Sequence, residues 1–413
     1  MASVSAAAPV RRALRLAPYL GPAFLVSVGY MDPGNWATDI EGGARFGYSL
    51  LWVLLLANLM ALLLQYLSAK LGLATGRTYP QVCREQFPRP VTLFLWVTAE
   101  GAALATDLAE FLGAALGFYL LLHIPMLAAA LITAVAVLGI LALYRFGFRP
   151  VEFVILGLVG IIGLAYVFEV YLVKPDWTAV AAGVFVPRLN GDSLLIAMGM
   201  LGATVMPHNL YLHSGVVLTR RHPDPRANDR VRRAALADSV IALNLAWLVN
   251  SAMVVMAAGT FFLQGLDVDS IEAAHETLTP LLGPGAAFTF AIALLAAGLS
   301  SSTTATLAGQ MIIEGFLQIR FGLLARRLIT VIPALLVIGL GLDAYWILIL
   351  SQVALSIQLP FAIAPLVWLT ARREVMGTQV NRRLTTSLAS IAALFVIGLN
   401  VLLLARLVTG AQS

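Results

Sequence analysis

Long apolar stretches separated by short polar loops are the feature of this 413-residue sequence that most constrains its fold. A transmembrane helix needs roughly 20 mainly apolar residues. Eleven stretches meet this need, near 18–43, 48–75, 91–120, 124–145, 150–173, 193–219, 232–263, 280–318, 328–342, 345–370 and 384–408. Only 11% of the residues are charged, against about 25% in soluble domains. We therefore predict an all-α polytopic membrane protein whose outer surface contacts the lipid bilayer.

Basic residues gather in alternate loops of this predicted topology. Of the 26 lysines and arginines, 22 fall on one side, together with the N-terminal segment 1–17. The other side keeps Arg45, Lys174, Arg188 and Arg406. Cytoplasmic loops are enriched in Lys and Arg. We expect a cytoplasmic N-terminus and an external C-terminus in a bacterial-type plasma membrane, and we attribute the net charge of +5 to topology rather than to a nucleic-acid partner.

Two loops have distinct predicted roles. The segment 220–231 is polar and contains proline, so we predict a cytoplasmic linker between two halves of the protein. The segment 265–279 contains Asp267, Asp269 and two glutamates but no Lys or Arg, which favours the external side. Neither loop is long enough for a second folded domain.

Two spans carry a proline in the middle, at Pro33 in the first span and at Pro207 in the sixth. Proline removes a backbone donor and interrupts a helix. A simple kink is the alternative for each span alone. The two positions, however, begin two sets of five spans, and five crossings reverse the orientation of the second set. This pattern predicts an inverted repeat with paired broken helices, comprising 18–173 and 174–370, followed by an eleventh helix in 371–413.

The side chains at the two interruptions predict a cation site. Asp32 offers a carboxylate, Asn35 an amide oxygen, Met206 a thioether and Ala203 a backbone carbonyl. An ionisable residue at mid-membrane is a functional candidate. Sulfur favours transition metals over Mg²⁺ or Ca²⁺, which prefer oxygen. The alternative for Met206 is a core-filling residue, where methionine is common.

Several segments resemble the Nramp family of proton-coupled Mn²⁺/Fe²⁺ transporters nearly end to end. They are GYMDPGNWATDIEGGARFGYSLLW at 29–52, ATDLAEFLGAALG at 105–117, GATVMPHNLYLHS at 202–214, RRLIT at 326–330 and LSQVALS at 350–356. The resemblance implies a LeuT-type fold with ten core helices and an added eleventh. It also implies metal ligands at Asp32, Asn35, Met206, Ala203, Gly29 and Gln352.

A second group of residues is predicted to carry protons. Asp107 and Glu110 share one face of the third span and can hold a proton between them. His208 follows the break, and histidine is the side chain that ordinarily titrates nearest neutral pH. The resemblance implies that these residues, with Asp32, Arg326, Arg327 and Glu100, form a pathway separate from the metal exit. The alternative for Asp107 and Glu110 is a structural pairing with arginines.

These expectations combine into a secondary active transporter that imports Mn²⁺/Fe²⁺-type ions by alternating access, accompanied by protons. The rival within the same fold is a sodium-coupled amino-acid or amine symporter. An intramembrane metalloenzyme would need clustered histidines or a catalytic pair with usable spacing, and the sequence offers neither. We therefore expect no enzymatic activity, no bound cofactor apart from the transported ions, and no obligate protein partner.

Overall fold

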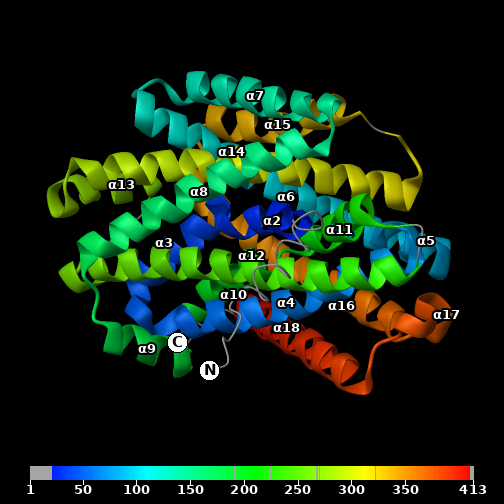
Figure 1. Cartoon of the computed structure of the whole chain (residues 1–413). Helices are drawn as coiled ribbons and strands as arrows, with labels where there is room; N and C mark the ends of the chain where they lie inside the picture. Colours follow the sequence, from blue (N-terminus) through cyan, green and yellow to red (C-terminus); the bar gives the residue numbers. More distant parts are fainter. Residues whose placement is uncertain are drawn as a thin grey trace, which may run out of the picture.

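The computed structural model describes residues 21–189, 192–222, 225–266, 268, 270–320 and 322–409. Within these ranges all regular secondary structure is helical. Most of the long helices lie lengthwise beside one another in a single bundle (Figure 1). The predicted all-α architecture is confirmed.

The long helices correspond to the predicted spans. They are α2 (Pro22–Ser27) continued by η2 (Val28–Met31), α3 (Pro33–Phe46), α4 (Leu51–Thr75), α6 (Arg89–Leu122), α7 (Met126–Ala142), α8 (Phe148–Val173), α10 (Ser193–Val205), α11 (Pro207–Val216), α12 (Pro225–Thr260), α14 (Pro284–Leu317), α15 (Leu323–Gly339), α16 (Ala344–Thr370) and α18 (Arg383–Thr409). Nine segments of the described chain are long and apolar enough to cross a membrane. Ten of the predicted spans each correspond to one long helix or to a broken pair, whereas the eighth, 280–318, takes in the last residues of α13 before α14 begins at Pro284.

Short helices occupy several connections. They are η3 (Gly47–Leu50), α5 (Tyr79–Gln86), η4 (Leu143–Phe146), α9 (Trp177–Phe185), η5 (Val217–Arg220), η6 (Phe262–Gln264), α13 (Ile271–Leu282), α17 (Arg373–Met376) and η7 (Gly377–Gln379). They lie mostly at the two ends of the bundle, where chain reversals connect the long helices (Figure 1).

Two sequence predictions about loops are wrong in part. The predicted linker 220–231 is helical from Pro225 onward, because α12 extends past the membrane-spanning stretch. The predicted loop 265–279 contains most of α13, whose start is capped by the Ser270 side chain, which accepts a hydrogen bond from the Ala273 amide. The predicted segment 1–17 and residues Asp267 and Asp269 lie outside the described residues.

The centre of the bundle depends on close contact between α6 and α14. A Cβ on Gly298 would lie 2.5 Å from the backbone nitrogen of Ala114. A Cβ on Gly117 would lie 2.7 Å from the Cα atom of Leu295. Small residues allow helix backbones in membranes to approach in this way. These contacts hold α6, which carries Asp107 and Glu110, against the middle of the protein.

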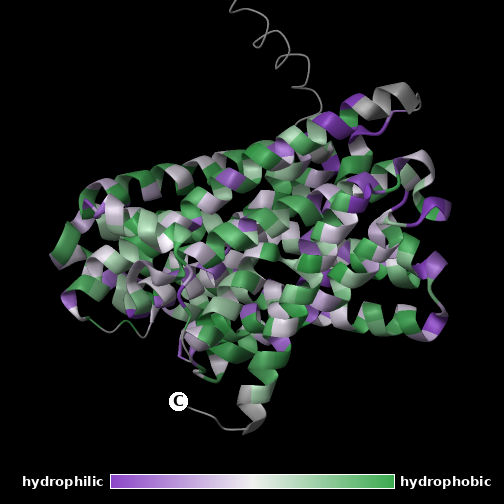
Figure 2. Cartoon of the chain, turned by 90° about the horizontal axis from the view of Figure 1, so that it is seen from below, coloured by the Kyte–Doolittle hydropathy of each residue, from purple (hydrophilic) through white to green (hydrophobic). Residues whose placement is uncertain are grey.

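The outer surface fits a lipid environment. Large apolar side chains are strongly exposed on peripheral helices, including Val135 on α7, Leu164 on α8, Leu336 on α15 and Leu394 on α18. Apolar colouring covers the length of the bundle, whereas hydrophilic segments concentrate near its ends (Figure 2). An apolar surface of this extent is stable against lipid and costly against water.

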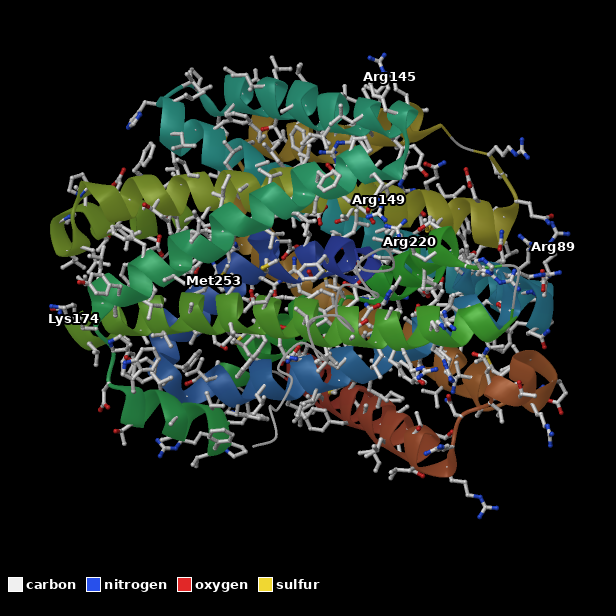
Figure 3. All side chains as sticks on the ribbon, in the orientation of Figure 1. Arg89, Arg145, Arg149, Lys174, Arg220 and Met253 are labelled. Atoms are coloured by element: carbon white, nitrogen blue, oxygen red, sulfur yellow. The ribbon has the colours of Figure 1, made fainter. Side chains whose placement is uncertain are left out.

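The two ends of the bundle differ in charge. Arg89, Arg145, Arg149 and Arg220 lie toward one end, and Lys174 lies at the opposite end (Figure 3). This separation agrees with the alternation of basic loops along the sequence.

Candidate functional site

The first helix is interrupted at Asp32, which has extended backbone angles (φ −72°, ψ 164°) between η2 and α3. One carboxylate oxygen, Oδ1, accepts a hydrogen bond from the backbone N–H of Asn35 at 2.7 Å. This is an N-cap, and Pro33 occupies the first helical position, where its missing N–H does no harm. The other oxygen, Oδ2, has no hydrogen-bond partner among the described residues. Asp32 therefore caps α3 with Oδ1, while Oδ2 remains available to bind a ligand.

The sixth helix is interrupted at Met206, between α10 and α11. Its φ of 35° and ψ of 98° place a bulky residue in a backbone region that side chains rarely adopt. Pro207 begins α11 in the same way that Pro33 begins α3. Such strain is retained where surrounding structure enforces it, and it concentrates at functional sites.

Each proline also frees one specific carbonyl. In an α-helix the carbonyl of residue i accepts from the N–H of residue i+4. Pro33 is four residues after Gly29, and Pro207 is four residues after Ala203. Neither proline has an N–H, so the Gly29 and Ala203 carbonyls lose their helical donors at the ends of the two broken helices.

These freed carbonyls converge on the Asn35 side chain. Asn35 Nδ2 lies 3.4 Å from the Gly29 oxygen, 3.3 Å from the Ala203 oxygen and 2.7 Å from Asp32 Oδ1. Three oxygen acceptors from two distant chain segments thus surround one point. Asp32, Asn35 and Ala203 are fully buried. A cluster of oxygens that converges on a buried donor is the arrangement that a cation would also satisfy.

The thioether of Met206 lies beside the same point. A Cβ built on Gly29 would be 3.2 Å from Met206 Sδ and closer still to Asn209 Nδ2, so glycine lets both side chains pack against η2. Met206 is fully buried, and its sulfur accepts from Asn209 Nδ2 at 3.4 Å. The structure therefore brings five predicted residues together: Asp32, Asn35, Gly29, Ala203 and Met206.

Gln352 approaches this group from α16 but does not hydrogen-bond to it in the described structure. A Cβ on Gly34 would lie 1.7 Å from Gln352 Nε2, so the amide packs directly against the start of α3. Its Nε2 donates to Ser351 Oγ at 3.2 Å, and its Oε1 has no partner within the described ranges. Gln352 therefore has an unpartnered amide oxygen, and its amide packs against Gly34, two residues after Asp32.

Two buried asparagines that the sequence reasoning missed support the site. Asn250 on α12 donates to the Tyr30 carbonyl at 2.8 Å and to Asn35 Oδ1 at 3.3 Å. Asn209 on α11 donates to the Val26 carbonyl at 3.3 Å as well as to Met206. The available signal was an amide side chain within an apolar span, which rarely goes without a partner.

The predicted proton residues form a network beside this site. Arg326 Nη1 lies 2.7 Å from Glu100 Oε1, and Arg326 Nη2 lies 3.8 Å from Asp107 Oδ2. Arg327 Nη1 lies 3.4 Å from Asp107 Oδ1, and its Nη2 donates to Ser302 Oγ at 2.6 Å. Both arginines and Asp107 are buried. The pairing of Asp107 with arginines, left open by the sequence, is present.

Glu110 and His208 occupy the space between the network and the breaks. His208 Nδ1 is 3.2 Å from Thr106 Oγ1, the residue before Asp107, and His208 Nε2 has no partner in the described part of the chain. Neither carboxylate oxygen of Glu110 has a hydrogen-bond partner there. Glu110 interacts electrostatically with the like charges of Asp32 and Asp107 and with the opposite charge of Arg327. The two residues therefore link the metal-site candidate to the arginine network.

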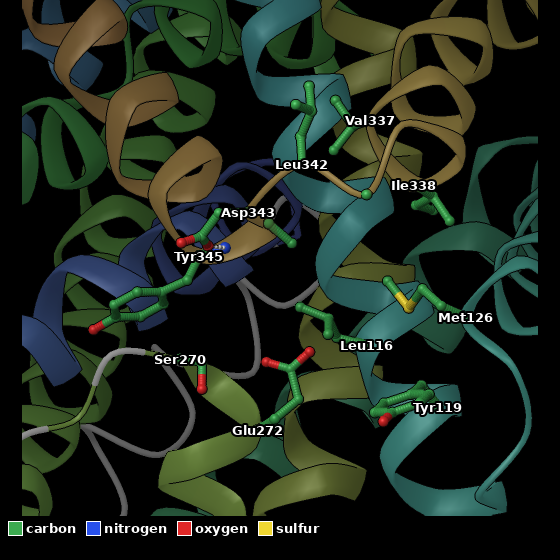
Figure 4. A pocket seen from close by; sticks show the side chains of 12 residues that line it. Leu116, Tyr119, Met126, Ser270, Glu272, Val337, Ile338, Leu342, Asp343 and Tyr345 are labelled. Atoms are coloured by element: carbon green, nitrogen blue, oxygen red, sulfur yellow. Dashed lines mark hydrogen bonds between the residues drawn. The ribbon is translucent and has the colours of Figure 1, made fainter.

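A separate cavity of about 530 Å³ lies away from these residues. It is lined by ends of α6 and α13 and by the connection from α15 to α16, with the carboxylates of Glu272 and Asp343 among its walls (Figure 4). Asp343 also caps α16 by accepting from the Tyr345 and Trp346 amides. None of the predicted site residues lines this cavity.

Comparison with solved structures identifies the fold class of the protein. Mhp1, a nucleobase-cation-symport-1 family transporter, matches with a TM-score of 0.62 at 15% identity over 93% of this chain and 91% of Mhp1. The shared architecture is the LeuT-type transporter fold, as predicted. A manganese transporter of Eremococcus coleocola, in complex with an aromatic bis-isothiourea compound, matches with a TM-score of 0.85 at 35% identity over 94% of this chain and 86% of that chain.

The family follows from the sequence comparisons. The family model described as natural resistance-associated macrophage protein-like (Nramp) matches residues 23–406. The divalent metal cation transporter MntH of Deinococcus radiodurans is 49% identical over 414 aligned residues, covering 99% of this chain and 94% of that protein. The chain belongs to the Nramp family.

The contrast between Asp107 and Glu110 yields a stability test. Asp107→Asn leaves Arg326 and Arg327 buried without their shared carboxylate, and breaking a buried ion pair costs about 3 kcal/mol or more. Glu110→Gln removes a buried charge that is repelled by Asp32 and Asp107, is attracted by Arg327 at longer range, and makes no ion-pair contact within the described residues. We expect a clearly lower Tm in detergent for Asp107→Asn and an unchanged or higher Tm for Glu110→Gln. Equal losses in both variants would contradict this assignment.

Proposed function

We propose that this protein is a secondary active transporter that imports divalent transition-metal ions such as Mn²⁺ and Fe²⁺ by alternating access. The observation that carries the proposal is the convergence of the Asp32 carboxylate, two freed carbonyls and the Met206 thioether between the two broken helices. The similarity to MntH and to the Eremococcus coleocola manganese transporter supports the same substrate class.

The donor types account for a preference among cations. Asp32 supplies negative charge, while Gly29 and Ala203 supply neutral oxygens that replace part of the hydration shell. Met206 supplies sulfur, which favours softer transition metals over Mg²⁺ and Ca²⁺. The Gln352 amide packs against Gly34 of α3, and its unpartnered oxygen would join the ligands when the surrounding helices move.

Asn35 has a particular role in this proposal. It presents its amide nitrogen to the three oxygens, and its oxygen accepts from Asn250. Binding a cation requires the Asn35 side-chain amide to turn. This turn brings Oδ1 among the three oxygens and moves the competing donor, Nδ2, away. In this proposal Asn35 exchanges its role as hydrogen-bond donor to the three oxygens for that of a metal ligand.

Protons accompany the metal in the proposed mechanism. A carboxylate must be deprotonated to bind a metal, so metal and proton compete at Asp32. Glu110 and His208 provide nearby groups that can take up a proton. Asp107, Arg326 and Arg327 continue from them as a buried ionic network that ends at the half-buried Glu100. This route is distinct from the path of the metal.

The proposed topology has a cytoplasmic N-terminus and an external C-terminus in a bacterial plasma membrane. The inverted repeats comprise 18–173 and 174–370, and the eleventh helix lies in 371–413. The gathering of Arg89, Arg145, Arg149 and Arg220 at one end supports this orientation.

The sodium-coupled amino-acid symporter is the weaker alternative. Sites of that kind present helix N-termini to a substrate carboxylate. Here the buried Asp32 carboxylate would repel such a substrate. Competition distinguishes the two functions, because unlabelled Mn²⁺ should block uptake and amino acids should not.

Transport into proteoliposomes tests the metal site and the proton coupling. Asp32→Asn retains a good N-cap for α3 but removes the charge, so we expect Mn²⁺ uptake to fall at least about tenfold. Asp176→Asn is the matched control, because Asp176 caps α9 in the same way, away from the breaks. Wild-type uptake should acidify the lumen.

Two results would count against the proposal. Unchanged Mn²⁺ uptake by Asp32→Asn would exclude Asp32 as an essential ligand. Mn²⁺ uptake without acidification would exclude obligatory proton coupling and leave metal transport intact.

Metal selectivity tests the thioether. Met206→Leu keeps the volume of the side chain but removes sulfur, so we expect Mn²⁺ transport to persist while Mg²⁺ or Ca²⁺ transport appears. Met253→Leu is the control, since Met253 is also buried but lies on α12 (Figure 3). Competition of unlabelled Mg²⁺ and Ca²⁺ with Mn²⁺ uptake measures the change. The same selectivity in wild type and Met206→Leu would contradict a role for the sulfur.

A further inference from the structure

A second cavity, unrelated to the two broken helices, lies between α4, α12, η7 and the start of α18. Its volume is about 480 Å³. The segments that enclose it meet toward the end of the bundle where α17 and the beginning of α18 are drawn (Figure 1). In the proposed topology this is the cytoplasmic end.

The cavity is strongly basic. Lys70 of α4, Arg232 and Arg233 of α12, and Arg382 before α18 all line it. Thr378, Gln379 and Thr385 add polar groups between the cations. Arg232 and Arg233 make further interactions within the protein, so Lys70 is the main evidence for an anion. Basic side chains that line one cavity favour an anionic ligand.

The position of Lys70 shows that the cavity is a structured site and more than a set of surface arginines. Its side chain is only 5% exposed, yet its ammonium group has neutral partners. Nζ donates to Asn381 Oδ1 at 2.7 Å and lies 5.9 Å from the centre of the Tyr66 ring. The charge of Arg232 acts repulsively on it. A largely buried cation beside another cation is costly unless an anion compensates it.

The neutral partner of Lys70 is itself held in place. Asn381 Nδ2 donates to Thr370 Oγ1 at 2.8 Å, and the Asn381 amide donates to the Thr370 carbonyl at 3.0 Å. The connection between α16 and α18 is therefore anchored to the end of α16. This anchoring orients Asn381 toward Lys70 and keeps the ammonium group at the cavity wall.

Apolar surface adjoins the basic cavity on two helices. Leu236 lines the cavity and is 42% exposed, and Val240, one turn further along α12, is 43% exposed. On α18, Leu384 and Leu388 are 71% and 48% exposed and flank the lining residue Thr385. A ligand that combines an anionic group with hydrocarbon chains matches both surfaces.

We propose that this cavity binds the phosphate group of an anionic phospholipid, with the acyl chains along the exposed faces of α12 and α18. Basic pockets between transmembrane helices on the cytoplasmic side bind such headgroups in general. The bound phosphate neutralises the cluster around Lys70. It also joins α4, α12 and the start of α18, three segments that are distant in the sequence.

Native mass spectrometry of the delipidated full-length protein tests the proposal. The probes are phosphatidylglycerol, phosphatidylcholine and inorganic phosphate. We expect phosphatidylglycerol to bind more tightly than phosphatidylcholine. The double variant Arg232→Gln/Arg382→Gln removes two cations. Each cation contributes about 1 kcal/mol to the binding free energy at an anionic membrane surface. The affinity of the variant for phosphatidylglycerol should therefore fall roughly 30-fold.

Matched variants separate the cavity from general charge. Arg89→Gln/Arg145→Gln removes the same charge from exposed positions at the same end of the bundle and should bind phosphatidylglycerol as the wild type does. Lys70→Met should weaken binding, whereas Lys70→Arg should retain it. Mn²⁺ uptake by each variant verifies that it is folded.

Three outcomes would overturn the proposal. Equal binding of the two lipids would show that the cavity does not select anionic lipid. Equal losses in the two double variants would assign the effect to net charge. If inorganic phosphate bound and its binding weakened in Arg232→Gln/Arg382→Gln, with no preference of the wild type for phosphatidylglycerol, the ligand would be a free anion.

Discussion

The structure depends on two backbone carbonyls that have lost their helical hydrogen bonds. Pro33 and Pro207 lack the backbone N–H groups that would otherwise donate to the Gly29 and Ala203 carbonyls in a continuous helix. Lipid cannot satisfy a polar group at this depth, so the broken segments must lie inside the protein. The Asn35 amide bridges both carbonyls and the Asp32 carboxylate in the described structure. The same constraint that breaks the helices therefore brings three oxygen acceptors from two distant segments around one buried donor.

The surrounding helices are arranged to support these breaks. Gly113 on α6 leaves room for the ring of Pro33, since a Cβ there would lie 2.0 Å from the Pro33 Cβ. Gly298 lets α14 approach the same helix. Asp238 on α12 holds the start of α2 by accepting from the Gly21 and Ala23 amides at 3.1 and 2.8 Å. The ionic network of α6 and α15 thus lies against a tightly packed core, and in the proposed mechanism a change at Asp32 reaches it through Glu110.

The sequence predicts the fold well because hydropathy and proline position are local signals. It also predicts which residues border the two breaks, and the structure brings most of them together. The helix in 265–279 was not predicted because it is too short to form an apolar repeat of membrane-spanning length, although Ile271, Ala274 and Leu278 are buried. Asn209 and Asn250 were missed because their importance lies in contacts with Met206, Tyr30 and Asn35. The basic cavity was missed for the same reason: Lys70 and Asn381 are 311 residues apart.

The central claim is that a divalent transition metal binds between the two broken helices. Anomalous X-ray diffraction from crystals of the wild-type protein soaked in Mn²⁺ tests this most directly, because the anomalous signal locates the metal without reference to transport. We predict a peak within coordination distance of the Asp32 carboxylate and the Met206 sulfur. A peak confined to other acidic residues, such as Glu272 and Asp343, with none between the breaks, would contradict it.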